Sequence, residues 1–158
     1  MHDTLAMGAI AASEPFTIEH ASLFDLWPIW RVERAAFGSD AYDPLTLLGM
    51  ALTPRMVRLK AVVAGRIAGF VAGEISAREG CGWIVTIGVH PDAQGRGIGT
   101  ALLLAAEREL GASCIRLTVR LSNTRAIGLY QRCGYRWVST YRRYYHDGED
   151  GLVMEKQV

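Results

Sequence analysis

Residues 85–107 read VTIGVHPDAQGRGIGTALLLAAE, and the rest of the chain is organised around this stretch. It begins with β-branched and apolar residues typical of a strand. His90-Pro91-Asp92 ends that strand, because proline cannot donate to a β-ladder. Glycines follow Gln94, and the alanines and leucines behind them favour a helix. The pattern therefore predicts a strand, a glycine-rich turn and the first turn of a helix.

Such a turn is chemically suited to hold an anion. The first amides of a helix have no partner inside it, and the helix dipole makes that end positive. Glycine lets the backbone approach a ligand closely, because it has no Cβ. We therefore predict a phosphate cradle here, to which Arg96 adds a positive charge.

The glycine spacing separates three phosphate-binding patterns. A P-loop needs a lysine after its last glycine, and the dinucleotide fingerprint needs GxGxxG, and residues 95–99 fit neither. The spacing Gln-x-x-Gly-x-Gly of Gln94, Gly97 and Gly99 resembles the acetyl-CoA pyrophosphate loop of the GNAT acetyltransferase superfamily. Taken alone, the same glycines are also compatible with a simple strand–helix turn.

Composition places the chain among globular proteins. It has 158 residues, 50% of them hydrophobic, which supports one domain with a core. We predict a flexible tail at residues 1–14 and a single domain at 15–158. A net charge of +1 implies no nucleic-acid partner, and the apolar runs are too short to predict a membrane partner.

The three cysteines, Cys81, Cys114 and Cys133, show no CxxC spacing. We predict that they do not pair, that the chain has no metal site and that it works in the reducing cytoplasm.

Hydrophobic periodicity and turn residues predict an α/β fold with a mixed central sheet of about seven strands flanked by four helices. The expected strands are 15–19, 56–64, 67–76, 84–89, 114–121, 135–143 and a last strand from 152. The expected helices are 22–37, 43–53, a long helix ending at Gly111, and 125–132.

A second motif strengthens the resemblance to the GNAT superfamily. Residues 117–130, LTVRLSNTRAIGLY, followed by Cys133-Gly134-Tyr135, are similar to its other signature. Residues 142–150, RRYYHDGED, resemble the N-terminal acetyltransferases, which include RimI-like ribosomal-protein-alanine N-acetyltransferases and N-α-acetyltransferase catalytic subunits. The resemblance implies the GNAT fold, with the fourth and fifth strands splayed around acetyl-CoA as co-substrate.

The resemblance also implies the site residues. Tyr130 would lie near the thioester sulfur as general acid. Residues 87–89 would hold the acetyl and pantetheine part, residues 95–100 the pyrophosphate, and Asn123 the cofactor arm. The implied cofactor contacts are Ile87, Gly88, Val89, Gln94, Gly95, Arg96, Gly97, Ile98, Gly99, Thr100, Asn123 and Tyr130. The implied walls of the acceptor slot are Phe37, Ala41, Tyr42, Tyr144 and Tyr145.

Three of these residues also have an ordinary structural interpretation. Asn123 suits a helix N-cap, Tyr130 a core tyrosine, and the Tyr144-Tyr145 pair ordinary strand aromatics.

The general base departs from the family pattern. The alanine acetyltransferases carry Glu where this chain has Thr118, and a eukaryotic relative has His there with a helping Tyr at the position of Trp83. Neither Thr nor Trp can accept a proton at neutral pH. We predict Glu74, on the neighbouring strand, as the substitute base acting through water.

The implied reaction is direct acetyl transfer to a primary amine, with the N-terminal α-amino group of a protein or peptide as predicted acceptor. Such a group has a pKa of about 8, so it needs little help to lose its proton. A small-molecule amine (a polyamine, amino acid or antibiotic) and a non-catalytic acyl-CoA sensor stay open as alternatives. Both a monomer and a homodimer are compatible with the sequence.

Overall fold

A computed structural model describes residues 14–158, so all but Glu14 of the predicted tail lies outside the described residues. The strands are β1 (Phe16–His20), β2 (Val57–Val63), β3 (Arg66–Ile75), β4 (Gly82–Val89), β5 (Cys114–Arg120), β6 (Arg136–Tyr141) and β7 (Gly151–Gln157). The helices are α1 (Leu26–Phe37), α2 (Pro44–Leu52), α3 (Ile98–Leu110) and α4 (Thr124–Arg132), with 3-10 turns η1 (Leu23–Asp25), η2 (Gly38–Asp40) and η3 (Pro91–Ala93). The predicted α/β fold and its element order are confirmed.

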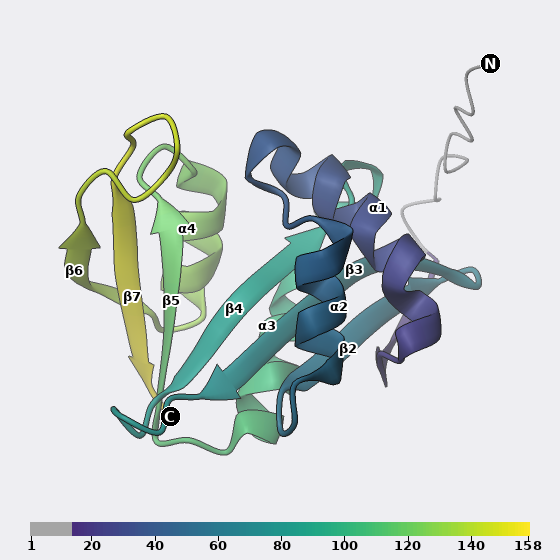
Figure 1. Cartoon of the computed structure of the whole chain (residues 1–158), viewed down its shortest axis with the longest axis horizontal. Coiled ribbons are helices and arrows are strands. Elements are labelled where there is room, and N and C mark those ends of the chain that lie inside the picture. The colour runs from purple at the N-terminus through teal and green to yellow at the C-terminus, as the bar shows by residue number, and fades with distance from the viewer. Residues whose placement is uncertain (1–13) are drawn as a thin grey trace.

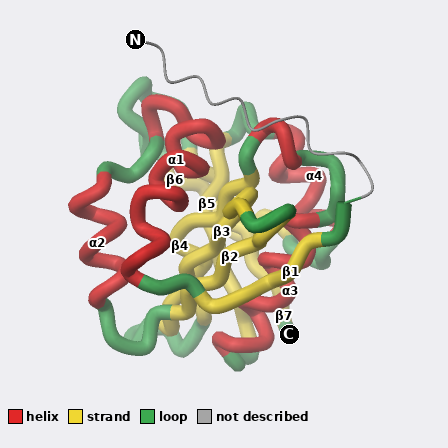
Figure 2. Tube along the Cα trace, turned by 90° about the vertical axis from the view of Figure 1, so that its right-hand side faces the viewer, coloured by secondary structure: helices red, strands yellow, loops and turns green. Residues whose placement is uncertain are grey.

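One mixed sheet runs through the molecule in the order β1-β2-β3-β4-β5-β7-β6. Its strands lie between α1 and α2 on one side and α3 and α4 on the other (Figure 2). The main core fills the α3 side, where Ile98, Leu102 and Leu103 of the helix are almost fully buried against the sheet. Among residues 14–158, no helix has the length and apolar character needed to cross a membrane.

β4 and β5 are the only parallel neighbours among the described strands, and they separate soon after they begin. Residues 82–84 of β4 pair with residues 115–117 of β5, and the register goes no further. Beyond these pairs the two strands diverge toward their C-terminal ends (Figure 1). The predicted splay is therefore present, and it leaves one backbone edge of β4 without a strand partner from Val85 onward.

A bulge at Val85 sets the direction of the side chains in this opening. The pairing of β3 with β4 skips Val85, because Ala72 pairs with Thr86 and Gly73 with Ile84. An extra residue of this kind reverses the alternation of side chains beyond it. Ile84 therefore packs on the α3 side, whereas Thr86 points toward α1.

The last hairpin is shorter than the sequence predicts. β6 ends at Tyr141 instead of residue 143, because Arg143 takes a positive φ of 50° and its N–H donates to the Asp150 carboxylate at 2.9 Å. Tyr144 and Tyr145 consequently lie in the loop between β6 and β7.

The prediction that the cysteines do not pair is wrong for two of them. Cys81 and Cys114 form a disulfide, with their Cα atoms 4.9 Å apart, and Cys133 is free. Cys81 precedes β4 and Cys114 begins β5, so the bond joins the strands at the end where they pair. Their separation of 33 residues concealed this proximity, which arises from the parallel pairing. The inference of a reducing compartment loses the support it drew from unpaired cysteines.

Candidate active site

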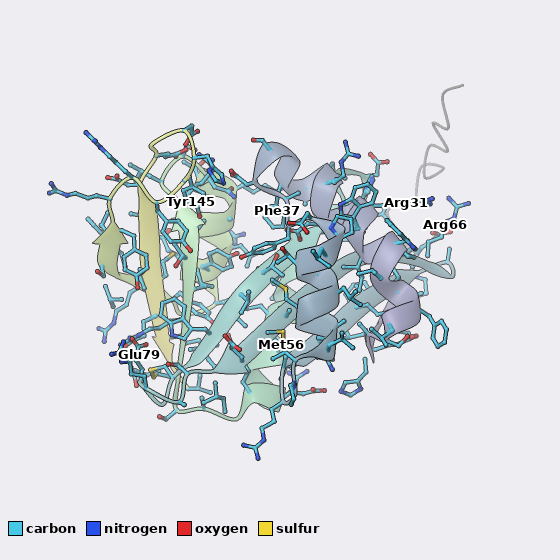
Figure 3. The ribbon with its side chains drawn as sticks, viewed as in Figure 1. Arg31, Phe37, Met56, Arg66, Glu79 and Tyr145 are labelled. Carbon is cyan, nitrogen blue, oxygen red and sulfur yellow. A yellow bond between two sulfur atoms is a disulfide. The ribbon has the colours of Figure 1, made fainter. Side chains whose placement is uncertain are left out.

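Two cavities of about 390 Å³ each lie at the opening between β4 and β5. One extends over the glycine-rich turn, and we call it the glycine-loop cavity. The other, the tyrosine cavity, extends between α1 and the β6–β7 loop, where Phe37 and Tyr145 lie on opposite sides of the opening (Figure 3). The residues that line both cavities are Phe37, Ile87, Asn123 and Tyr130. These four define a neck where the two cavities meet.

The glycine-loop cavity brings together every predicted cofactor contact except Arg96. Lining it are Ile87, Gly88, Val89, Gln94, Gly95, Gly97, Ile98, Gly99, Thr100, Asn123 and Tyr130. Arg96 does not line the cavity, and its Nη1 is buried without a hydrogen-bond partner in the part of the chain that the structure describes. The cation beside the loop is instead Arg125, whose guanidinium lies 3.9 Å from the position that a Cβ on Gly95 would take. Sequence reasoning missed Arg125 because it treated that helix only as the carrier of Tyr130.

The backbone of this cavity fits a diphosphate. Gly95 and Gly97 have φ values of 80° and 81°, which non-glycine residues rarely adopt. Gly97 is the N-cap of α3 and has no side chain to cover the first amides of the helix. These amides therefore line the cavity at the positive end of the helix dipole. Acetyl-CoA carries a diphosphate, so the residues present suit it.

Asn123 and Tyr130 come from α4 and its N-terminal cap. The Asn123 side chain accepts a hydrogen bond from the Ala126 N–H at 3.2 Å, so Asn123 caps the helix and also lines both cavities. Tyr130 is 8% exposed, and its ring packs edge-on against Tyr135 with 6.0 Å between centroids. Burial raises the pKa of Tyr130 above its ordinary value, so the phenol is protonated at neutral pH and can donate.

The tyrosine cavity is lined by the predicted acceptor-slot residues Phe37, Tyr42, Tyr144 and Tyr145, but not by Ala41. Burial raises the pKa of Tyr145 to about 12, so its hydroxyl also stays protonated near neutral pH. Thr118, at the position where the resemblance implies a base, lines the cavity too, and its hydroxyl cannot accept a proton at neutral pH.

Arg120 joins the two walls of the tyrosine cavity. Its Nη2 donates to Asp40 at 2.8 Å, and its Nη1 donates to Asp147 at 2.9 Å and to Glu149. The guanidinium also lies over the Tyr145 ring, 4.2 Å from the centroid. Asp40 belongs to η2 and the other partners to the β6–β7 loop, so one side chain of β5 fixes both loops. The DGED segment at residues 147–150 thus supplies Arg120 with partners.

Two carboxylates line the tyrosine cavity besides Asp40. Glu74 lies near the end of β3 and is exposed, in keeping with its predicted action through water. Glu33, on α1, was not predicted, although it is only 1% exposed. Its Oε1 accepts the Tyr42 N–H at 3.1 Å and its Oε2 accepts the Thr86 hydroxyl at 3.2 Å. Burial raises the pKa of Glu33 to about 7.

A signal for Glu33 exists in the sequence. It lies four residues after Ile29 and four before Phe37, on the apolar face of α1. A single acidic residue on such a face must be buried or functional.

A glycine turn suited to a diphosphate, which opens past a buried tyrosine into a second cavity, is the arrangement expected of an enzyme that transfers an acyl group from a coenzyme A thioester. Residues 21–135 match the acetyltransferase (GNAT) family, and the chain belongs to this family. Its members use acetyl-CoA.

Curated relatives and solved structures extend this likeness. The chain is 36% identical over 137 residues to an uncharacterized N-acetyltransferase of Methanocaldococcus jannaschii, covering 84% of this chain and 86% of that protein. It is 32% identical over 144 residues to the [ribosomal protein bS18]-alanine N-acetyltransferase of Salmonella typhimurium, covering 87% and 95%. The crystal structure of the ribosomal-protein-S18-alanine N-acetyltransferase of Escherichia coli superposes with a TM-score of 0.82 at 28% identity, covering 91% of this chain and 94% of that chain.

Proposed function

We propose that this acetyltransferase acts on the N-terminal α-amino group of a protein or peptide. The observation that carries the proposal is the neck at Tyr130, where a diphosphate-binding cavity meets a second cavity lined by tyrosines and carboxylates. The similarity to a bacterial ribosomal-protein-alanine acetyltransferase along almost its whole length supports this acceptor class.

Backbone groups position the co-substrate in this proposal. Acetyl-CoA supplies an activated acetyl thioester. The amides at the start of α3 hold the diphosphate, and the edge of β4 at Ile87, Gly88 and Val89 faces the pantetheine and acetyl part. Free N–H groups of that edge polarise the thioester carbonyl toward attack. Tyr130 donates its proton to the departing sulfur. A thiolate left in the same buried neck is also poorly solvated, which favours its protonation.

The acceptor enters through the tyrosine cavity. Phe37 and Tyr42 form one wall, Tyr144 and Tyr145 the other, and Arg120 holds the two together. The sequence predicts Glu74 as the base that receives the amine proton through water. Its place in the lining of this cavity is compatible with that prediction.

A peptide panel tests the acceptor. Each peptide contains one lysine and is supplied with a free N-terminus and, as its matched control, with an acetylated one. We expect mass spectrometry to find one acetyl group added to free peptides and none added to blocked ones. Transfer to lysine in both versions, or to no peptide, would contradict the proposal.

A small amine is the second candidate, and Thr118 is the observation that favours it. Relatives that acetylate N-terminal alanine carry a glutamate at this position, so its loss points to a different acceptor. Turnover of a polyamine, an amino acid or an aminoglycoside, with none of any peptide, would select this candidate. Coenzyme A binding without any acetylated product would instead indicate a sensor.

A further inference from the structure

Glu33 is the carboxylate most deeply placed in the tyrosine cavity. Glu33 is 1% exposed, yet it forms part of the cavity lining. It lies one helical turn before Phe37, which belongs to the neck, and Thr86, its hydrogen-bond partner, is the residue next to Ile87 of the neck. Glu74, in contrast, is exposed near the end of β3. Phe37 and Thr86 thus link Glu33 to the neck, where the amine and the thioester would meet.

The surroundings of Glu33 do not neutralise it. It receives two hydrogen bonds, one from the Tyr42 amide and one from Thr86. The titratable groups that line the cavity with it, from the other elements around it, are Asp40, Tyr42, Glu74, Arg120, Tyr130, Tyr141, Tyr144 and Tyr145. Arg120 is the single cation in that lining, and it is held by Asp40, Asp147 and Glu149. A buried carboxylate in this position is a good acceptor for a proton brought in by an ammonium group.

We propose that Glu33 is the proton acceptor of the transfer reaction. The inference rests on the proposed function, because it requires an amine in the tyrosine cavity. Glu33 takes one proton from the entering ammonium group, directly or through one water, and passes it to solvent. The nitrogen lone pair forms the bond to the acetyl carbon, the carbon–sulfur bond breaks, and the thiolate takes the proton of Tyr130. The second proton lost by the nitrogen restores Tyr130, so the product is the amide and a free thiol.

Glu33 also anchors the loop after η2 to β4, so a structural role must be distinguished from proton transfer. A carboxylate with a pKa near 7 differs little from a peptide α-ammonium with a pKa of about 8, so the transfer is nearly balanced. A base of this kind gives kcat/KM an ascending limb near pH 7. A purely structural carboxylate would change the height of the profile without removing that limb.

The test is the pH profile of kcat/KM, measured with whichever amine the wild type acetylates. We expect Glu33→Gln to lower kcat/KM roughly 100-fold at pH 7 and to remove the limb, leaving only the rise due to the amine itself. Thr86→Val should move the limb to higher pH, because the carboxylate loses a donor that favours its charged form. Glu79→Gln, in the β3–β4 turn, is the matched control and should retain the wild-type profile.

Glu74→Gln is the competing variant. A profile that keeps its limb in Glu33→Gln and loses it in Glu74→Gln would overturn the proposal and select Glu74. An unchanged limb in Thr86→Val would also contradict it. Coenzyme A titration calorimetry and thermal unfolding verify that each variant is folded and binds its co-substrate. If the wild type acetylates no amine, both the proposed function and the role of Glu33 are wrong. If the wild type acetylates an amine but Glu33→Gln keeps the limb, only the role of Glu33 is wrong.

Discussion

The two cavities that meet at Tyr130 are lined by different parts of the chain. The glycine-loop cavity is lined mainly by residues between Ile87 and Thr100, four of them glycines, with α4 and the end of α1 beside them. The tyrosine cavity is lined by residues from many separate elements, among them α1, the loop after η2, β3, β4, β5 and the β6–β7 loop. We therefore expect binding of the diphosphate to depend on chain conformation, and recognition of the acceptor to depend on a few side chains held by Arg120. Four substitutions test this division.

Replacing Tyr130 tests the neck that both cavities share. We expect Tyr130→Phe to lower kcat roughly 100- to 1000-fold, because general acid catalysis contributes on that scale. Coenzyme A affinity, measured by calorimetry, should change little, since the ring remains. Tyr135→Phe is the control, because Tyr135 is the buried neighbour of Tyr130 but donates to Glu107 in the core. Equal loss of kcat in both variants would show that Tyr130 acts only through packing.

Replacing a glycine tests the backbone cavity. Gly97→Ala places a side chain on a residue with φ of 81°, and we expect about tenfold weaker binding of coenzyme A as the strained loop shifts. The KM for the amine should stay the same. Gly111→Ala carries similar strain at the other end of α3, with φ of 61°, and should lower the melting temperature without changing this affinity. Equal coenzyme A affinity in the two variants would contradict the diphosphate cradle.

Replacing Arg120 tests the side-chain cavity. Arg120→Lys keeps the charge but loses the planar fork that contacts Asp40, Asp147 and Glu149 together. We expect the KM for the amine to rise several-fold while coenzyme A affinity is retained. Arg116→Lys, four residues earlier on β5, breaks pairs with Glu79 and Glu155 outside both cavities. A rise in the amine KM in Arg116→Lys as large as that in Arg120→Lys would contradict the assignment.

Burial of Glu33 predicts a pH-dependent stability difference. Folding raises the pKa of Glu33 from 4.5 to about 7. Its contribution to the free energy of unfolding is therefore fully present below pH 4.5 and is lost as the pH rises through 7. The wild type should lose stability relative to Glu33→Gln by at most about 1.4 kcal/mol per pH unit across this window. Thermal unfolding at pH 5 and pH 8 measures it, and we expect a relative shift of a few degrees. A constant difference between the two proteins would contradict the raised pKa.

The same division explains what the sequence could predict. Residues 85–107 carry a strand, a turn and a helix in one continuous pattern, and the residues between 87 and 100 that line the glycine-loop cavity could be predicted from it. Arg96 is the exception, because glycine spacing fixes the backbone but not the direction of a side chain between two glycines.

Tertiary contacts account for what the sequence did not predict. Thr86 lies 53 residues after Glu33 in the chain, and the two meet only because α1 crosses the end of β4. The Cys81–Cys114 bond likewise depends on the parallel pairing of β4 and β5. The spacing of the two cysteines in the sequence does not predict it. The ends of β6 and the position of Tyr144 depend on a positive φ at Arg143, which arginine rarely adopts.

The bulge at Val85 has a consequence for mutation. Side chains along β4 alternate with a period of two, and the unpaired residue shifts the phase of everything after it. Deleting Val85 would restore an uninterrupted alternation while Ile84 still pairs with Gly73 and Thr86 with Ala72, so Thr86 would still point toward Glu33 and Ile87 toward α3. We therefore expect such a deletion to change the local twist of β4 at the opening and to leave the directions of its site side chains unchanged.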